Sequence, residues 1–425
     1  AQGVALSASK LNIKATIVMP TTTPSIKIQS VRKFGVKVEL IGDSFDEAYE
    51  YALEVSRKEG KVFIHPFDDP LVIAGQGTVA KEIVEEFQDK PDIFFIPVGG
   101  GGLISGMSLY LKTHYPNSKV YGVESQDAPT LFTSLENGKP TSLDQVGLFV
   151  DGCAVKRIGE ETFKISKKYV DGVILVSIDE ICAAIKDIYE DTRVMSEPAG
   201  ALSVAGMEKF LLSNEVKGKK IMAVNSGANL NFDRLRHVTE RAEIGEGKEI
   251  LLSVKIPEKP GSFRSFCEII GKRSISEFNY RFANEKSANV FVGVKTDEIE
   301  EDSKCIFEDL SNNKYSYIDL TQNEVAKLHL RYMVGGKPTS IINEKLFRFE
   351  FPEKPGALLN FLNKMKKDWG ITLFHYRNHG SAFGRVLVGI DIGNDSENSL
   401  EEFLQDLDYK YTEETQNEGY SSFLK

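Results

Sequence analysis

The C-terminal half of the chain contains one segment twice. Residues 256–263 (Ile-Pro-Glu-Lys-Pro-Gly-Ser-Phe) recur as residues 351–358 (Phe-Pro-Glu-Lys-Pro-Gly-Ala-Leu), and residues 275–281 recur as residues 371–377. The first offset is 95 positions and the second is 96, so a single-residue insertion separates the copies. A repeat at a fixed period indicates two copies of one structural module. The repeat therefore predicts two similar small domains in this half of the chain.

Each copy has the same predicted order of elements: a strand, a Pro-Gly turn, a helix, two strands, an acidic helix and a last strand. This βαββαβ order is that of the ferredoxin-like motif. We place the first module at residues 250–322 and the second at residues 344–418. A duplicated small module that follows a larger domain indicates regulation more than chemistry.

The N-terminal part, residues 1–243, alternates short apolar runs with helical patterns such as residues 44–59. The predicted strands are residues 15–19, 36–41, 62–65, 93–98, 120–124, 172–176 and 221–225. Apolar strands joined by helices predict an α/β fold with a mainly parallel sheet that is covered on both faces. Ligands in such folds bind at the carboxyl ends of the strands. The Glu/Gly-rich residues 242–249 mark the end of this domain.

Charge and composition exclude several classes of protein. The 425 residues carry a net charge of -10, which disfavours binding to nucleic acid. No apolar run approaches the roughly 20 residues that span a bilayer, so we expect no membrane segment. The first residues lack the basic and apolar blocks of a signal peptide, and we expect a cytoplasmic protein.

The cysteines and histidines predict no metal site. Four cysteines are scattered along the chain: Cys153, Cys182, Cys267 and Cys305. Their spacing predicts reduced and mostly buried thiols. His375 and His379 lie in a predicted strand and the loop after it, which lacks the geometry of a helical metal pair.

A run of glycines follows the predicted strand at residues 93–98. Its members are Gly99, Gly100, Gly101 and Gly102, with Leu103 opening a helical pattern. At a strand-to-helix turn the exposed N–H groups and the helix dipole form an anion site, most naturally for phosphate. The alternative is a tight turn with close helix packing. A dinucleotide is also considered, because Glu124 ends the next strand, but Ile104 or Ser105 stands where the G-x-G-x-x-G fingerprint needs its third glycine.

Two further turns of small residues follow later in the chain. Residues 225–229 (Asn-Ser-Gly-Ala-Asn) come after a strand, so Ser226 is expected at the same sheet edge as the glycine run. Residues 197–201 (Glu-Pro-Ala-Gly-Ala) are predicted to pack a helix.

Together these motifs resemble a known family. The loop at residues 99–103 and the turns at residues 197–201 and 226–229 resemble the tryptophan-synthase-β-like fold (fold type II) of pyridoxal-phosphate enzymes, in particular its serine/threonine dehydratase branch. Three segments of the C-terminal half, residues 278–282, 328–336 and 374–377, are similar to the paired ACT-like regulatory domain of the biosynthetic threonine deaminases.

The resemblance implies a cofactor and a reaction. Residues 99–103 would hold the phosphate of pyridoxal 5'-phosphate, and Ser226 would bind its ring nitrogen. L-Threonine would lose water and ammonia to give 2-oxobutanoate, the first step of isoleucine biosynthesis, with L-serine as a second substrate. Isoleucine would inhibit, valine would oppose it, and the enzyme would be a homotetramer.

The chain departs from the family pattern at its start. In this family the Schiff-base lysine lies in a Ser-Phe-Lys motif that would stand upstream of Ala1, so we interpret the sequence as N-terminally truncated. No catalytic residue is assigned within it, because Lys10, Lys14 and Lys27 are interpreted as surface residues. The alternative is a catalytically inactive subunit that binds an amino acid.

Effector residues are predicted in the two modules. Isoleucine would meet backbone at the Pro-Gly turns, residues 260–261 and 355–356, near Tyr280 and Tyr376. The alternative for both tyrosines is packing between strand and helix.

Overall fold

The computed structural model describes the chain except residues 88, 258–261, 271–272, 274, 285–286, 297–298, 333–342, 353–356, 367–368, 378–382, 394–395 and 424–425. The polypeptide divides between Ala242 and Glu243 into two compact units.

Unit 1 alternates strands and helices. In chain order they are α1 (Gln2–Lys10), β1 (Thr16–Met19), α2 (Ser25–Arg32), β2 (Lys37–Leu40), α3 (Phe45–Glu59), α4 (Pro70–Glu86), β3 (Ile93–Pro97), α5 (Gly102–His114), β4 (Lys119–Ser125), α6 (Thr130–Glu136), α7 (Glu160–Tyr169), β5 (Gly172–Val176), α8 (Ile178–Thr192), α9 (Pro198–Ser213), β6 (Ile221–Ala223), the short η1 (Phe232–Arg234) and α10 (Leu235–Gly245).

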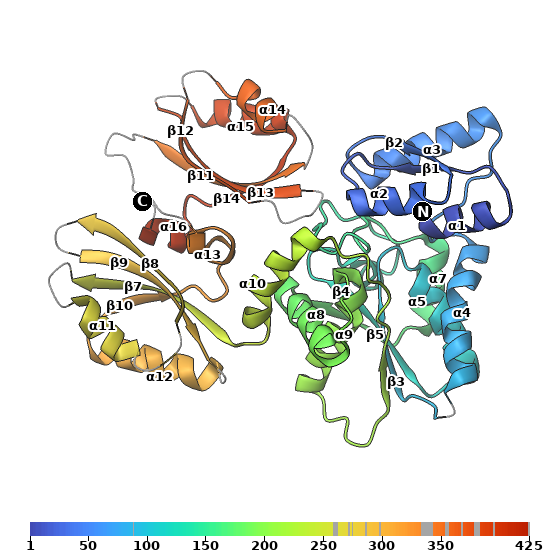
Figure 1. Cartoon of the computed structure of the whole chain (residues 1–425), viewed down its shortest axis with the longest axis horizontal. Coiled ribbons are helices and arrows are strands. Elements are labelled where there is room, and N and C mark those ends of the chain that lie inside the picture. The colour runs from blue at the N-terminus through green and yellow to red at the C-terminus, as the bar shows by residue number, and fades with distance from the viewer. Residues whose placement is uncertain are drawn as a thin grey trace. The chain divides into compact units, whose positions relative to one another are not determined.

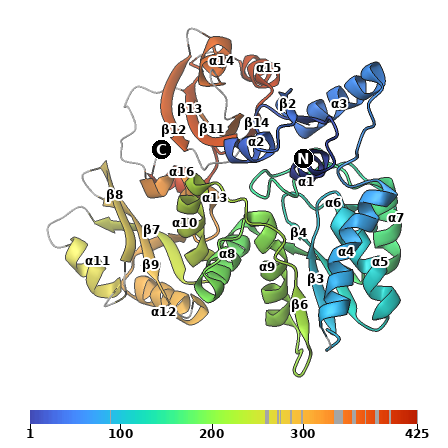
Figure 2. The same ribbon diagram turned by 45° about the vertical axis from the view of Figure 1, so that its right-hand side comes forward.

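A four-stranded parallel sheet organises unit 1. Its strand order is β5-β4-β3-β6, while β1 and β2 form a separate parallel pair. Every residue of β3 is buried, because alternate side chains of the strand enter different cores. Phe95 joins the core beneath α8 and α9, and Phe94 joins the core beneath α4 and α5. Figures 1 and 2 show these helices on opposite faces of the sheet. The predicted α/β fold with a parallel sheet is confirmed.

One predicted strand is wrong. Residues 62–65 form no strand and pair with no sheet. Their aromatic side chains instead build a cluster in which Phe63 and His65 each meet Tyr49 edge-on, and His65 meets Phe67 with ring centroids 4.8 Å apart. Aromatic residues favour strands in general, but here packing between rings satisfies them without a neighbouring strand.

Unit 2 contains the two repeated modules. The first comprises β7 (Glu249–Pro257), α11 (Ser262–Ile270), β8 (Ile275–Asn284), β9 (Ser287–Lys295), α12 (Ile299–Asn312) and β10 (Ser316–Asp319), followed by α13 (Glu324–Leu328) and η2 (Leu330–Tyr332). The second comprises β11 (Glu344–Pro352), α14 (Ala357–Lys364), β12 (Gly370–Arg377), β13 (Phe383–Asp391), α15 (Glu397–Leu407) and β14 (Lys410–Glu413), followed by α16 (Glu418–Phe423). Both sheets are antiparallel, ordered β10-β7-β9-β8 and β12-β13-β11-β14, so the ferredoxin-like βαββαβ prediction is confirmed.

The modules share a core between their sheets. In each module one sheet face packs on its own two helices, α11 with α12 and α14 with α15. The opposite faces contribute Leu251 and Phe291 from the first sheet and Leu346 and Leu387 from the second to one cluster that includes α13 and α16. Figure 1 shows α13 and α16 between the two sheets.

A four-residue sequence repeat precedes the two helices of this shared core. Thr-Gln-Asn-Glu occurs at residues 321–324 and again at residues 415–418, and its glutamate is the first residue of α13 in one copy and of α16 in the other. The hydroxyl of Thr321 accepts a hydrogen bond from the N–H of Leu251, and the hydroxyl of Thr415 accepts one from the N–H of Leu346, both at 3.1 Å. The amide of Asn323 donates to Asn417 Oδ1 at 3.2 Å. The two threonines therefore make equivalent contacts, each within its own module, and the bond between Asn323 and Asn417 joins the modules.

Other sequence expectations concern membranes and thiols. In the part of the chain that the structure describes, no helix has the length and apolar character needed to cross a bilayer. Cys182 is buried and Cys153 is partly buried, but Cys305 is exposed on α12, so the prediction of mostly buried thiols is wrong for Cys305. The Cys267 side chain lies outside the described part.

We expect Asn417→Ala to loosen α16. Asn417 Oδ1 accepts hydrogen bonds from the N–H groups of Gly419 and Tyr420 as well as from Asn323. Loss of such a cap costs about 1 kcal/mol, so the amides of α16 should exchange about fivefold faster with deuterium. The matched control is Asn312→Ala at an exposed position on α12. Equal exchange of α16 in both variants would contradict the role given to Asn417.

Candidate functional site

The pairing of β3 with β6 sets two of the predicted motifs side by side. The parallel register places Phe95 opposite Ala223, and the N–H of Val224 donates to the carbonyl of Phe95 at 3.0 Å. The glycine run, residues 99–103, follows β3, and the turn at residues 225–229 follows β6. Both segments therefore leave the sheet at the carboxyl ends of neighbouring strands, where α/β folds bind ligands.

The glycine run packs so closely against Phe67 and Thr162 that there is no room for side chains at Gly100 and Gly101. A Cβ on Gly100 would lie 2.3 Å from the ring of Phe67, and one on Gly101 would lie 2.9 Å from Thr162. Gly101 also has φ of +91°, a left-handed conformation that favours glycine, and it caps the start of α5. Close packing thus accounts for part of the glycine requirement, as the alternative interpretation predicted.

Two threonine hydroxyls hold the carbonyl groups of the run. Thr162 donates to the carbonyl of Gly100 at 2.8 Å, and Thr130 lies 3.3 Å from the carbonyl of Gly99. Because a trans peptide directs its N–H opposite to its C=O, these contacts turn the N–H groups of Gly100 and Gly101 away from the threonines. Among the described residues, none accepts a hydrogen bond from the N–H of Gly99, Gly100 or Gly101.

These free N–H groups create a site for an anion. They stand at the N-terminal end of α5, where the helix dipole adds a partial positive charge. Backbone N–H groups at a helix start suit a phosphate that bears several acceptor oxygens. The residues present therefore fit the phosphate of pyridoxal phosphate.

Ser226 is exposed in the turn after β6. Its hydroxyl lies 3.4 Å from the carbonyl of Ala199. The turn is fixed from beneath by the segment at residues 197–201: the N–H of Glu197 donates to the carbonyl of Gly227 at 3.1 Å, and the hydroxyl of Ser196 donates to Asn225 Oδ1 at 2.8 Å. Residues 197–201 thus support the turn that carries Ser226, and α9 begins at Pro198.

A charged cluster beside this turn was missed by the sequence analysis. The ammonium of Lys27 on α2 lies 2.9 Å from Asp151, and Arg234 lies 3.3 Å from the same carboxylate. Burial acts to raise the pKa of Asp151, but the charges of Arg234 and Lys27 outweigh it and lower the pKa. Lys10 and Lys14 are exposed as predicted, whereas the prediction for Lys27 is wrong, because this side chain is partly buried in an ion pair.

A second missed feature is the turn that carries Phe67. His65 Nδ1 accepts hydrogen bonds from the N–H groups of Phe67 (3.2 Å) and Asp68 (2.7 Å). The carboxylate of Asp68 in turn accepts from the N–H groups of Glu160, Glu161 and Thr162 at the start of α7. Through these bonds one turn sets both Phe67 and Thr162 against the glycine run.

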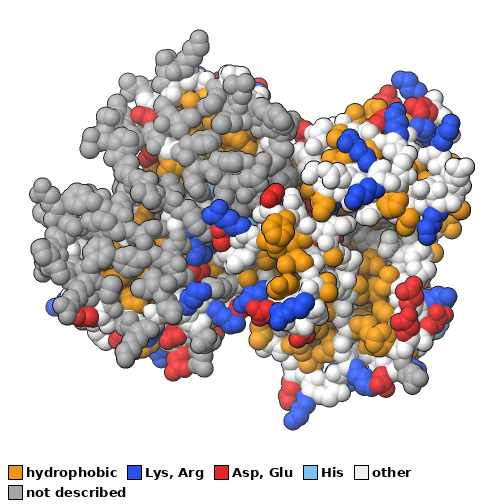
Figure 3. Space-filling model, in the orientation of Figure 1, with side chains coloured by type: hydrophobic (Ala, Val, Ile, Leu, Met, Phe, Trp, Pro, Cys, Tyr) orange, Lys and Arg blue, Asp and Glu red, His pale blue; other side chains and the backbone are white. Residues whose placement is uncertain are grey.

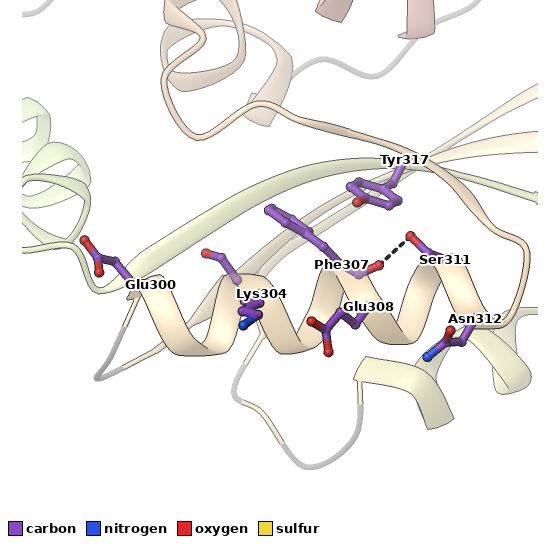
Figure 4. Close-up of a pocket in the computed structure, with 8 residues that line it drawn as sticks. Glu300, Lys304, Phe307, Glu308, Ser311, Asn312 and Tyr317 are labelled. Atoms are coloured by element: carbon purple, nitrogen blue, oxygen red, sulfur yellow. Dashed lines mark hydrogen bonds between the residues drawn. The ribbon is translucent and has the colours of Figure 1, made fainter.

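A shallow hollow on the first module of unit 2 is not this site. It has a volume of about 520 Å³ and lies along α12 and β10. Figure 4 shows Phe307 and Tyr317 beside each other above the helix, with Glu300, Lys304 and Glu308 along it. The lining is solvent-facing and mixed in charge, and no buried polar group points into it.

The predicted effector residues lie at the limit of what the structure describes. The backbone register pairs Tyr280 with Val290 and Tyr376 with Val386, but both tyrosine side chains and both Pro-Gly turns lie outside the described residues. No group of three or more potential metal ligands occurs among the described residues.

The sheet, the glycine run at its carboxyl edge and the Ser226 turn define the class of pyridoxal-phosphate-dependent enzymes of fold type II. The family described as pyridoxal-phosphate dependent enzyme matches residues 1–227, and the C-terminal regulatory domain of threonine dehydratase matches residues 240–330 and again 335–424. Within that class the chain belongs to the family of biosynthetic threonine dehydratases.

Relatives match over the whole chain. It is 49% identical to the biosynthetic L-threonine dehydratase of Escherichia coli and 48% identical to that of Burkholderia multivorans, with 100% of this chain and 82% and 84% of theirs covered. Among solved structures, the processed form of threonine deaminase isoform 2 from Solanum lycopersicum is 46% identical and covers 57% of this chain and 67% of its own, with a TM-score of 0.56. Maize serine racemase is 30% identical, covers 56% of this chain and 73% of its own, and has a TM-score of 0.53.

We expect Gly101→Asp to abolish cofactor binding. The substitution would bring a carboxylate against Thr162 and beside the phosphate position, at a φ that disfavours any side chain. Affinity for pyridoxal phosphate is measured on the enzyme as its gene encodes it. Gly218→Asp is the matched control, because Gly218 also has positive φ (+76°) but faces open space. Unchanged affinity in Gly101→Asp would remove residues 99–103 from the phosphate site.

We expect acid to loosen the turn at His65. Burial lowers the pKa of His65, so the unfolded chain takes up this proton at a higher pH than the folded protein does. The stability that the neutral ring contributes is therefore lost as the pH falls below about 6.5. His65→Asn keeps an acceptor that does not titrate, and its melting temperature should decline less between about pH 7.5 and 5.5. Parallel declines in the two proteins would exclude His65 as the titrating group.

Proposed function

We propose that this chain dehydrates and deaminates L-threonine to 2-oxobutanoate and ammonia, with pyridoxal phosphate as cofactor. The observation that carries the proposal is the joint presence of the free N–H groups at Gly100 and Gly101 and of two regulatory modules, in a chain 48–49% identical throughout to biosynthetic threonine dehydratases. The relatives that match over the whole chain bear dehydratase names, which favours the enzyme over an inactive amino-acid-binding subunit.

Each site residue has a distinct task in this proposal. When bound, pyridoxal phosphate supplies an electron sink that eases loss of a proton from the α-carbon of the amino acid. The N–H groups of residues 99–103 hold the phosphate and fix the position of the ring. Ser226 hydrogen-bonds the ring nitrogen, and because a hydroxyl cannot stabilise a pyridinium as a carboxylate does, the sink stays weak. A weak sink suits elimination of hydroxide from the β-carbon, and L-serine carries the same leaving group as L-threonine.

The duplicated modules support regulation by an amino acid. Two equivalent modules offer two similar pockets, which we assign to isoleucine as inhibitor and valine as its opponent, near Tyr280 and Tyr376. Because both sheets pack on one shared core, binding in either pocket would affect the packing of both modules.

We further propose a homotetramer in the cytoplasm. Large apolar side chains are exposed on unit 1, including Leu212 (90%), Leu71 (83%) and Phe232 (82%), and Figure 3 shows apolar side chains gathered on one face of this unit. Contiguous exposed apolar surface is a common sign of contact with another polypeptide.

An isoleucine titration of the initial rate tests this function. The enzyme as its gene encodes it should form 2-oxobutanoate from L-threonine, and isoleucine should inhibit it. Tyr376→Ala should leave turnover near normal but weaken inhibition about tenfold, since coupling free energies are typically about 1–3 kcal/mol.

The matched control is Tyr411→Ala, which changes an exposed tyrosine on β14 of the same module. Absence of 2-oxobutanoate would contradict the activity. Equal inhibition in wild type and Tyr376→Ala would contradict the effector site alone.

A further inference from the structure

Glu124 is a buried acid that the proposed function leaves without a task. It lies near the end of β4, and its side chain is fully shielded from solvent. Its carboxyl group accepts hydrogen bonds from the N–H groups of Leu131 (2.8 Å) and Phe132 (2.9 Å) and contacts the hydroxyl of Thr130 at 2.9 Å. These three residues form the first turn of α6, so Glu124 holds the start of this helix and is closed to a ribose.

The hydroxyl of Thr130 connects this acid to the glycine run. It has two acceptors within reach, Glu124 Oε1 at 2.9 Å and the carbonyl oxygen of Gly99 at 3.3 Å, but it carries a single proton. An ionised Glu124 accepts the hydrogen bond from the hydroxyl of Thr130. A protonated Glu124 instead donates a hydrogen bond to Thr130 Oγ1, and the hydroxyl of Thr130 then donates to the carbonyl oxygen of Gly99.

The two arrangements differ at the phosphate loop. A hydrogen bond from Thr130 to the carbonyl of Gly99 turns the N–H of Gly100 toward the anion side, because both groups belong to one trans peptide. Without that bond the Gly99–Gly100 peptide loses one of the contacts that orient it. The neighbouring peptide keeps its own contact from Thr162 to Gly100 in either case.

We propose that Glu124 is a positioning residue whose protonation, relayed through Thr130, sets how strongly the glycine run binds phosphate. The proposal rests on the proposed function, since it takes the N–H groups of residues 99–103 as the phosphate ligands.

The surroundings of Glu124 allow this proton to move near neutral pH. Burial raises the pKa of Glu124 to about 7, although the N–H groups of Leu131 and Phe132 and the hydroxyl of Thr130 act to lower it. The Cys153 thiol, beneath Gly99, stays neutral because burial raises its pKa to about 12. Beyond Cys153 lie the charges of Glu197, Asp151 and Lys27, and on the other side Asp127 is held by the hydroxyl of Ser125.

The sign of the pH effect follows from the relay. Below about pH 7 Glu124 is protonated and Thr130 holds Gly99. As the pH rises, the ionised carboxylate accepts the hydrogen bond from the hydroxyl of Thr130. The carbonyl of Gly99 then loses this donor, and the affinity of the glycine run for phosphate falls. Glutamine at this position does not titrate. Its amide oxygen fits the Oε1 position, which accepts from the N–H of Leu131 and from the hydroxyl of Thr130, so Glu124→Gln should remain in the weakly binding arrangement at every pH.

The test is calorimetric titration of the apoenzyme, as its gene encodes it, with deoxypyridoxine phosphate, a cofactor analogue that has the phosphate but no aldehyde. The quantity compared is the ratio of the wild-type affinity to the affinity of Glu124→Gln at the same pH. This ratio should fall about three- to tenfold between about pH 6 and about pH 8, which is the effect of one hydrogen bond. Ionisation of the ligand is common to both proteins and cancels in this ratio. Thr130→Val should bind about three- to tenfold more weakly than wild type at the lower pH and should not respond to Glu124→Gln.

Matched changes on the same helix are Glu136→Gln and Thr133→Val, which should behave as wild type. A constant ratio between wild type and Glu124→Gln across this pH range overturns the proposal, as does wild-type affinity in Thr130→Val. Failure of wild type to bind the analogue at all would instead overturn the phosphate assignment on which the proposed function depends.

Discussion

A buried peptide carbonyl needs a hydrogen-bond donor, and at the glycine run this requirement decides where the N–H groups point. Thr130 and Thr162 supply the donors for Gly99 and Gly100. Each threonine stands in the first turn of a short helix that a carboxylate caps, Glu124 for α6 and Asp68 for α7. The anion site is thus oriented by residues that hydrogen-bond the carbonyl oxygens of the glycine run on the side opposite to its free N–H groups.

The sequence predicted the glycine run that would bind the ligand, but not the residues that hold the run in place. Strand order and the run of glycines follow from local patterns, because apolar runs and small residues are visible in neighbouring positions. Asp68 and Thr162 are 94 positions apart, and nothing local pairs them. Residues 62–65 were predicted as a strand because their aromatic residues have the composition of one, whereas ring packing around His65 replaces sheet pairing.

The regulatory half shows how a duplicated module becomes one body. Each sheet alone would expose the face that α13 and α16 cover, and a two-layer domain with an apolar open face is unstable in water. The equivalent bonds of Thr321 and Thr415 fix the start of each helix to its own sheet, and the shared apolar cluster with the contact between Asn323 and Asn417 joins the copies around that face. The two modules therefore share one core, which is a physical requirement for coupling between a site in one module and a site in the other.

Two carboxyl groups close to a phosphate site, the buried Glu124 and the half-buried Asp68, present an electrostatic conflict, since like charges repel more strongly where water is excluded. The structure resolves it differently at each position. Asp68 directs its charge at three N–H groups of α7, where the helix dipole offsets it. Glu124 meets two N–H groups within a fully buried setting, and burial raises its pKa to about 7. Glu124 can therefore lose its charge near neutral pH, and the repulsion between Glu124 and a bound phosphate is smallest in the arrangement in which Thr130 donates to the carbonyl of Gly99.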